Sequence, residues 1–147
     1  MKEVVTMGRV KLDLPQEFIY FTEISVRIGD INYGGHMGND SVLSIIHESR
    51  LRFLKNYGFS ELDAGGAGII MADSVIVYKN QSFHGDLLKV EVTVQDFNRC
   101  GCDIFYKLSL KESGKEIVRA KTGIVFFDYE INKVSAVPEK FKAVFGE

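Results

Sequence analysis

The chain has 147 residues, of which 46% are hydrophobic and 26% are charged, and its formal net charge is -2. This composition is typical of a globular protein: disordered chains contain fewer apolar residues, and nucleic-acid-binding domains carry a strong positive charge. The length suits one domain, so we expect residues 1–147 to fold around a single core.

Membrane, secreted and metal-binding classes are also disfavoured. No apolar run approaches the roughly 20 residues that span a bilayer, and the start, Met1 to Val5, lacks the apolar stretch of a signal peptide. We therefore expect a cytoplasmic protein with no membrane partner and no nucleic acid partner. Two cysteines, Cys100 and Cys102, and three histidines are too few for a structural zinc pattern, and one intervening glycine favours reduced thiols over a disulfide.

The first predicted element is a strand between residues 23 and 28, in which an apolar side chain occupies every second position: Ile24, Val26 and Ile28. We expect this strand to end at Gly29-Asp30. A loop rich in glycine and short polar residues follows from 31 to 41, and it ends on three residue types that often cap helices: Asn39, Asp40 and Ser41. The loop is therefore expected to lead directly into a helix.

A helix is predicted from Ser41 to Tyr57, because its apolar positions approximate a 3.6-residue period and Gly58 is a typical stop. After a turn rich in glycine and alanine, three or four strands are predicted: Ile69 to Tyr78, Leu88 to Phe97, Cys102 to Glu112, and Glu116 to Asp128. Ser113-Gly114 indicates a hairpin between the last two strands, and residues 138–145 are expected to form a short helix.

One helix followed by consecutive strands is typical of an α+β fold in which an antiparallel sheet covers the helix. A sheet of this kind leaves edge strands and part of an apolar surface uncovered. Proteins commonly cover such surfaces by pairing with a second copy, so we expect a homo-oligomer.

Residues 30 to 39 form the most informative segment, because they place a carboxylate, two carboxamides, a histidine and three glycines immediately before the predicted helix. Hydrolysis of a thioester builds negative charge on the carbonyl oxygen, and the unpaired N–H groups at a helix start stabilise such a charge. The titratable groups available to position or deprotonate water are Asp30, His36 and Glu48. Asn32 can orient water or bind the carbonyl, but it cannot act as a base.

The segment from Arg27 to Asn39, together with Glu48-Ser49-Arg50 and Phe53-Leu54, resembles the signature of 4-hydroxybenzoyl-CoA-thioesterase-like hotdog proteins. Residues 83–88 and 119–128 resemble later parts of that family more weakly. The resemblance implies a hotdog fold, with a long central helix wrapped by a curved antiparallel sheet of five or six strands. It also implies hydrolysis of an acyl-CoA or acyl-carrier-protein thioester, without metal or cofactor, by a homodimer or homotetramer (dimer of dimers).

By the same resemblance, the catalytic candidates in this chain are Asn32, His36, Asp30 and Glu48. The residues implied to bind the substrate are Tyr33, Gly35, Met37, Gly38 and Asn39. We expect the thioester carbonyl to lie against the N–H groups near residues 37 to 39. Plant acyl-acyl-carrier-protein thioesterases resemble the same loop: their histidine falls on His36, but their asparagine falls on Gly34.

One departure from the family pattern concerns the base. The family's second aspartate, taken as nucleophile or general base, falls on Asn32, and a carboxamide is neither basic nor nucleophilic. Three interpretations stay open at this point: another group such as Glu48, Asp30 or a partner-chain side chain supplies the base; the protein binds acyl thioesters without catalysis; or it is a scaffold or dehydratase-like relative.

Each candidate also has a structural interpretation. His36 would brace the loop, Asp30 would accept backbone N–H bonds in a turn, and Glu48 would form an exposed pair with Arg52 one helical turn later.

Overall fold

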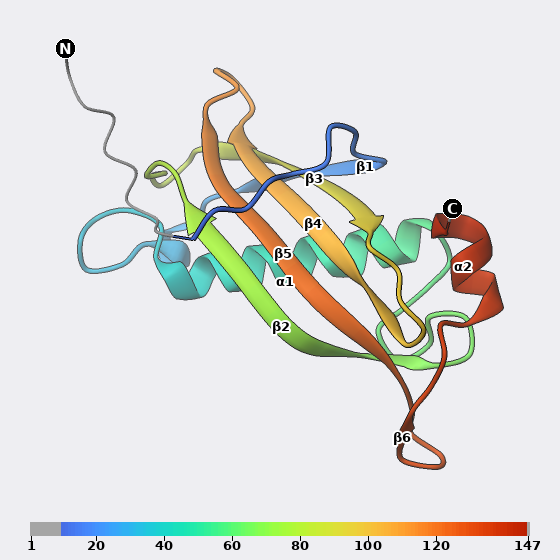
Figure 1. Ribbon diagram of the computed structural model, residues 1–147. Helices are drawn as coiled ribbons and strands as arrows, with labels where there is room; N and C mark the ends of the chain where they lie inside the picture. The colour runs from blue at the N-terminus through green and yellow to red at the C-terminus, as the bar shows by residue number, and fades with distance from the viewer. Residues whose placement is uncertain (1–9, 147) are drawn as a thin grey trace.

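A computed structural model describes residues 10–146 of the chain (Figure 1). The segment Met1 to Val5, on which the expected lack of a signal peptide rests, lies outside the described residues. No helix within residues 10–146 combines the length and the apolar character needed to cross a membrane.

One helix lies against one face of a curved antiparallel sheet, which confirms the α+β architecture (Figure 1). The sheet order is β1-β3-β4-β5-β2, and the short β6 pairs with β5. The elements in chain order are β1 (Tyr20–Ser25), a 3-10 helix η1 (Ile28–Asp30), α1 (Asn39–Asn56), β2 (Gly68–Tyr78), β3 (Leu87–Gln95), β4 (Gly101–Leu110), β5 (Glu116–Asp128), β6 (Lys133–Val134) and α2 (Glu139–Phe145).

The core lies between α1 and the inner face of the sheet. The apolar side chains that α1 buries recur every three or four residues, as a helix with one covered face requires: Val42, Ile45, Ile46, Phe53 and Leu54. The strands oppose them with alternate residues, among them Val90, Ile104, Leu108, Ile124 and Phe126. Each large apolar side chain buried in this way contributes roughly 1.5–3 kcal/mol, so this layer holds the fold together.

The C-terminal helix α2 covers the end of the core next to the last turn of α1. Phe141 is fully buried and its ring packs against the rings of Phe59 and Phe126. Figure 1 shows α2 at one end of α1 and the loop that precedes α1 at the other. The loop that precedes α1 therefore lies at the end of the helix away from α2.

Residues 10 to 19 form a segment that the sequence did not predict. In Figure 1 this segment crosses the face of the sheet opposite α1. The Arg119 guanidinium on β5 donates to the Leu12 carbonyl over 3.1 Å and also pairs with Glu116. Ile19 N–H donates to the Val92 carbonyl over 3.2 Å, which brings the chain into β1.

The first predicted strand is wrong at its C-terminal end. β1 stops at Ser25, and Ile28, which was expected on the apolar face, opens the 3-10 helix with 73% of its surface exposed. The cause is the Asp30 carboxylate, which accepts the Arg27 N–H over 2.8 Å and turns the chain. Phe97 likewise lies beyond β3, because Asp96 has a φ of 57° that ends the extended backbone.

The predicted helix cap is also wrong, since the N-cap is Gly38 and no side chain caps the first turn. A Cβ at this position would stand 2.7 Å from the Asp40 Oδ1 and 3.2 Å from the Asn32 Cβ. A side chain here would therefore force the Asp40 carboxylate and Asn32 to shift, because the loop packs directly on the start of the helix.

Both cysteines are free thiols, as the sequence predicted. Burial raises the pKa of Cys102 to about 12, and the Asp103 carboxylate beside it adds to the effect. Because the thiolate is the reactive form, Cys102 is inert at neutral pH.

Candidate active site

A cleft of about 420 Å³ opens at the N-terminal end of α1. Its lining comes from the loop before α1, the first turn of α1, the end of β2 with the residues that follow, and the beginning of β5. The apolar part of the lining consists of Val10, Met37, Val42, Ile76, Val77, Ile117 and Val118. The polar part consists of Asn32, His36, Asn39, Tyr78, Asn80, Gln81 and Ser82. A cleft of this size and mixed lining suits a small organic ligand.

The structure brings together some of the residues singled out in the sequence. Those that line the cleft are Asn32, His36, Met37 and Asn39. Gly35 and Gly38 shape the backbone without lining it, and the Tyr33 side chain projects fully into solvent. Asp30 and Glu48, the two carboxylates of the predicted site, do not line the cleft.

Asn32 holds the loop through its side chain. Its Oδ1 accepts the N–H of Gly34 over 3.0 Å and that of His36 over 3.3 Å. The backbone closes the same turn, since Asn32 N–H donates to the His36 carbonyl over 2.9 Å and Gly35 N–H donates to the Asn32 carbonyl over 3.0 Å. Because Oδ1 faces both N–H donors, the NH₂ group of this carboxamide is the part left for a ligand.

His36 is held in one tautomer by its neighbour. Its Nδ1 lies 3.2 Å from the Met37 carbonyl oxygen. A carbonyl only accepts hydrogen bonds, so Nδ1 carries the proton and donates it, and Nε2 of the neutral ring carries a lone pair. A Cβ at Gly34 would stand 3.4 Å from Nε2, so glycine leaves room beside this basic nitrogen.

The backbone N–H groups at the head of α1 are not all free. Met37 N–H donates to the Ser82 carbonyl over 2.8 Å, and Gly38 N–H donates to the Asp30 carbonyl over 3.0 Å. Asp40 N–H donates to the Asn39 Oδ1 over 3.0 Å. Among the described residues no acceptor engages Asn39 N–H, so this group, at the positive end of the helix dipole, is open to an anionic oxygen.

The two carboxylates of the predicted site have structural contacts. Asp30 is 6% exposed, and its bonds to Arg27 N–H and Gly38 N–H tie together the two ends of the loop. Glu48 is half-exposed on the outer side of α1 and lies 3.4 Å from Arg52.

No carboxylate lines the cleft within residues 10–146, and the titratable side chains in its lining are His36 and Tyr78. Burial raises the pKa of Tyr78, and the Asp40 charge raises it further. The phenol is therefore protonated at neutral pH and can donate a hydrogen bond, whereas His36 can accept a proton.

Sequence reasoning missed four cleft residues, the last residue of β2 and three that follow it: Tyr78, Asn80, Gln81 and Ser82. They lie in or next to an ordinary polar connection between two predicted strands and carry no motif. They reach the cleft because β2 pairs with β5 and because the Ser82 carbonyl binds Met37 N–H. Nothing in the sequence signals that contact between residues so far apart in the chain.

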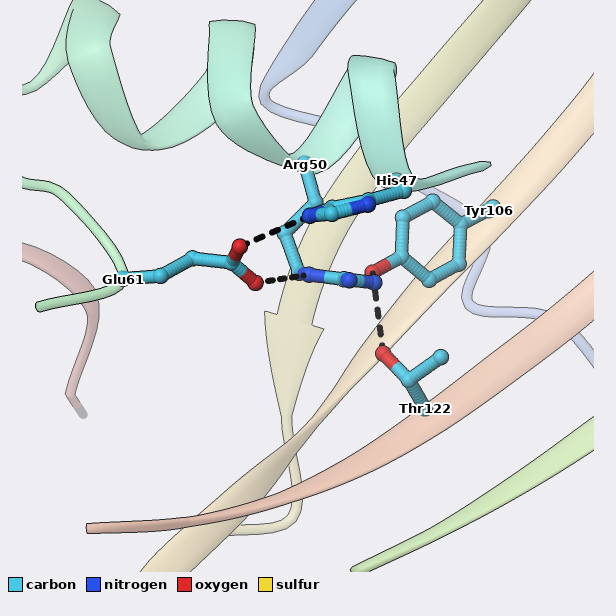
Figure 2. A network of polar contacts seen from close by, with 5 residues as sticks. All are labelled: His47, Arg50, Glu61, Tyr106 and Thr122. Carbon is cyan, nitrogen blue, oxygen red and sulfur yellow. Dashed lines mark hydrogen bonds and ion pairs between the residues drawn. The ribbon is translucent and has the colours of Figure 1, made fainter. Parts of the chain in front are cut away.

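A second polar cluster lies away from the cleft, under the middle of α1 (Figure 2). Arg50 Nε donates to Glu61 Oε2 over 2.9 Å, and its Nη1 donates to the Tyr106 hydroxyl over 3.3 Å. Tyr106 in turn pairs with Thr122 over 2.9 Å, and His47 Nε2 lies 2.8 Å from Glu61 Oε1. This cluster ties α1 to β4, to β5 and to the connection before β2.

Solved structures share this fold. A 1,4-dihydroxy-2-naphthoyl-CoA thioesterase from Synechocystis superposes with a TM-score of 0.77 at 20% identity, over 84% of this chain and 93% of that one. A DHNA-CoA thioesterase from Staphylococcus aureus superposes with a TM-score of 0.70 at 21% identity, over 79% of this chain and 78% of that one. At such identities the likeness concerns the fold, and it confirms the predicted hotdog architecture.

Sequence comparison gives the family. No curated protein matches the chain significantly. The thioesterase-like superfamily, however, matches residues 26–145, a span that includes the loop, α1, the cleft-lining end of β2 and the remaining strands. The chain therefore belongs to the thioesterase-like superfamily, and it is a thioester hydrolase by class.

Proposed function

We propose that this protein hydrolyses acyl-coenzyme A or acyl-carrier-protein thioesters in the cleft at the head of α1, giving a carboxylic acid and a thiol. The observation that carries the proposal is the meeting of apolar walls, a basic His36 Nε2 and an open Asn39 N–H in one cleft. The apolar walls suit an acyl chain. The superfamily supplies the thioester class, and two structural relatives bear the names of CoA thioesterases.

In the proposed reaction, His36 Nε2 takes a proton from water as the water oxygen attacks the thioester carbonyl carbon. The carbonyl oxygen becomes negative and is held by Asn39 N–H and the helix dipole. The C–S bond then breaks, and the thiolate leaves with the proton from the His36 imidazolium. The NH₂ group of Asn32 orients the water or the carbonyl, while its Oδ1 keeps the loop closed.

The choice of His36 follows from the lining of the cleft. The family's carboxylate position holds Asn32, and both Asp30 and Glu48 are engaged elsewhere. The hydrogen bond from Nδ1 to the Met37 carbonyl fixes the His36 ring and stabilises the imidazolium. The third residue of a catalytic triad has the same role toward its histidine.

We propose further that the protein works as a homodimer or homotetramer. β2 is an edge strand of 11 residues whose outer edge is unpaired within the described chain. Its last residues, Ile76, Val77 and Tyr78, line the cleft. A second copy paired along β2 would therefore lie beside the cleft and narrow its entrance for the pantetheine arm.

The test is a panel of acyl-CoAs of varied chain length and aromaticity, with release of free thiol as the readout. We expect turnover on part of the panel, and we expect His36→Ala to lower kcat by about 10²- to 10⁴-fold. His84→Ala is the matched control, because His84 is an exposed histidine outside the cleft lining, and it should leave kcat unchanged.

Two outcomes would contradict the proposal. Tight binding of acyl-CoA without turnover on any substrate, with hydrolysis appearing only in Asn32→Asp, would make the protein a binder. Full activity in His36→Ala would move the base to another group, such as a carboxylate of a partner subunit.

A further inference from the structure

The connection between β2 and β3 contains a buried hydroxyl that the proposed mechanism does not use. Ser82 is 1% exposed, and its hydroxyl oxygen has no hydrogen-bond partner among the described residues. Proteins rarely bury a polar group without a partner, because the group loses its bonds to water and gains nothing in return. A group of this kind that borders a cleft can be completed by a ligand bound there.

Ser82 also lies where such a ligand would bind. It lines the same cleft as His36 and Asn39, and its backbone carbonyl accepts the Met37 N–H over 2.8 Å. The residue is therefore fixed beside the start of α1, where the proposed mechanism places the thioester carbonyl.

Among the residues at the head of α1 that line the cleft, one backbone N–H is free for that carbonyl. The N–H groups of Met37 and Gly38 donate to protein carbonyls, and that of Asp40 donates to the Asn39 side chain. Neither Asn39 N–H nor Ser41 N–H has an acceptor among the described residues, but Ser41 does not line the cleft, which leaves the Asn39 N–H. Oxyanions in acyl-transfer enzymes are usually held by more than one donor, each placed in advance in a site that excludes water. The Ser82 O–H lies next to this position with its oxygen buried, and rotation about its single side-chain torsion turns it toward a ligand in the cleft.

We propose that the Ser82 hydroxyl is a catalytic residue that donates a hydrogen bond to the thioester oxygen and, with Asn39 N–H, forms the oxyanion hole. This inference rests on the proposed function. Ser82 keeps its proton throughout and forms no bond to the acyl group. Because the hydroxyl is shielded from water, its bond to a developing oxyanion is stronger than the same bond would be in solvent.

The test is Ser82→Ala, measured for both activity and thermal unfolding. We expect kcat to fall by about 10²- to 10³-fold with KM nearly unchanged, because the bond is made mainly in the transition state. We also expect the unfolding midpoint of the free enzyme to rise, since the substitution removes an unsatisfied buried hydroxyl. Ser82→Cys retains a weak S–H donor and should give an intermediate kcat.

Ser109→Ala is the matched control, because Ser109 in β4 is the other buried serine whose hydroxyl lacks a partner in residues 10–146, and it does not line the cleft. It should raise the midpoint and leave kcat unchanged. Wild-type kcat in Ser82→Ala would overturn the inference while the proposed function stands. Loss of both activity and stability would make Ser82 a structural residue, and absence of turnover in the wild-type enzyme would refute both proposals.

Discussion

At the scale of single residues, the carboxamide at position 32, where the family has a carboxylate, changes which residue of the loop can act as a base. The Asn32 carboxamide accepts two backbone N–H bonds through its oxygen, as a carboxylate there would, and it adds an NH₂ donor. It cannot take a proton. In the proposed mechanism the base is therefore His36, whose ring is oriented by the carbonyl of the next residue in the chain.

Glu61 provides a prediction about acid stability. Burial alone would raise the pKa of Glu61, but hydrogen bonds and charges from Arg50 and His47 outweigh burial and lower it. A depressed pKa contributes stability that is fully present above the unfolded value, about 4.3, and is lost as pH falls through the folded value. We expect Glu61→Gln to be less stable than wild type at neutral pH, and the difference to shrink as pH falls below about 4.

The measurement is urea unfolding of both proteins at a series of pH values. Asp63→Asn is a suitable control, because Asp63 belongs to the same connection and has no ion-pair partner among residues 10–146. A difference that stays constant with pH would show that the carboxylate of Glu61 does not stabilise the fold through its charge.

At the scale of elements, Arg50 and Arg52 lie on different faces of α1, although they are only two residues apart. Arg50 is 6% exposed and contacts Glu61 and Tyr106 under the helix. Arg52 points to the outer side, where it pairs with Glu48 and donates to Thr22. The helix period alone places them on different faces, and the sheet decides which face is buried.

The same substitution at both positions tests this difference. We expect Arg50→Met to cost roughly 3 kcal/mol of unfolding free energy, the low end for a broken buried pair, because Glu61 retains some access to water. Arg52→Met should cost less than about 1 kcal/mol, since an exposed ion pair is screened by solvent. Denaturant unfolding measures both values. Equal losses would mean that the cluster of Figure 2 contributes no more than a surface contact.

At the scale of the whole molecule, the sheet has two unequal edges. β1 is a strand of 6 residues, whereas β2 has 11 residues and exposes Ile70 and Tyr78. A long edge with exposed apolar side chains is a surface that invites pairing. Because β2 also ends in the cleft lining, association along this edge and activity should be coupled.

Lysines on that edge test the proposed association. Ala72 and Ser74 are both exposed on β2, and the double variant Ala72→Lys with Ser74→Lys should dissociate the oligomer, because lysines on facing strands repel one another. Sedimentation velocity should then report the 16.5 kDa monomer. The thiol-release assay should show reduced turnover for the same variant. Ser25→Lys on β1, the opposite edge, is the control and should remain oligomeric. A wild-type monomer would contradict the proposal directly.

Much of the fold follows from local patterns in the sequence. The spacing of Val42, Ile46 and Phe53 places α1, and the two-residue alternation places the strands, with β5 bounded as predicted from Glu116 to Asp128. These features are readable because they depend on neighbours within a few positions. Ile28 kept the alternation but left the strand, since one bond from Asp30 to Arg27 turned the backbone.

The sequence by itself determined the class of protein and the loop that carries His36 and Asn32, because both depend on short segments with their own chemistry. The tertiary structure decided which polar groups share a cleft. It placed Glu48 on the outer side of α1. It also brought Ser82 into the cleft lining, where the Ser82 carbonyl accepts the Met37 N–H. The physical reason is that burial and hydrogen-bond partners are set by residues distant in the chain, which come together only when the sheet folds around the helix.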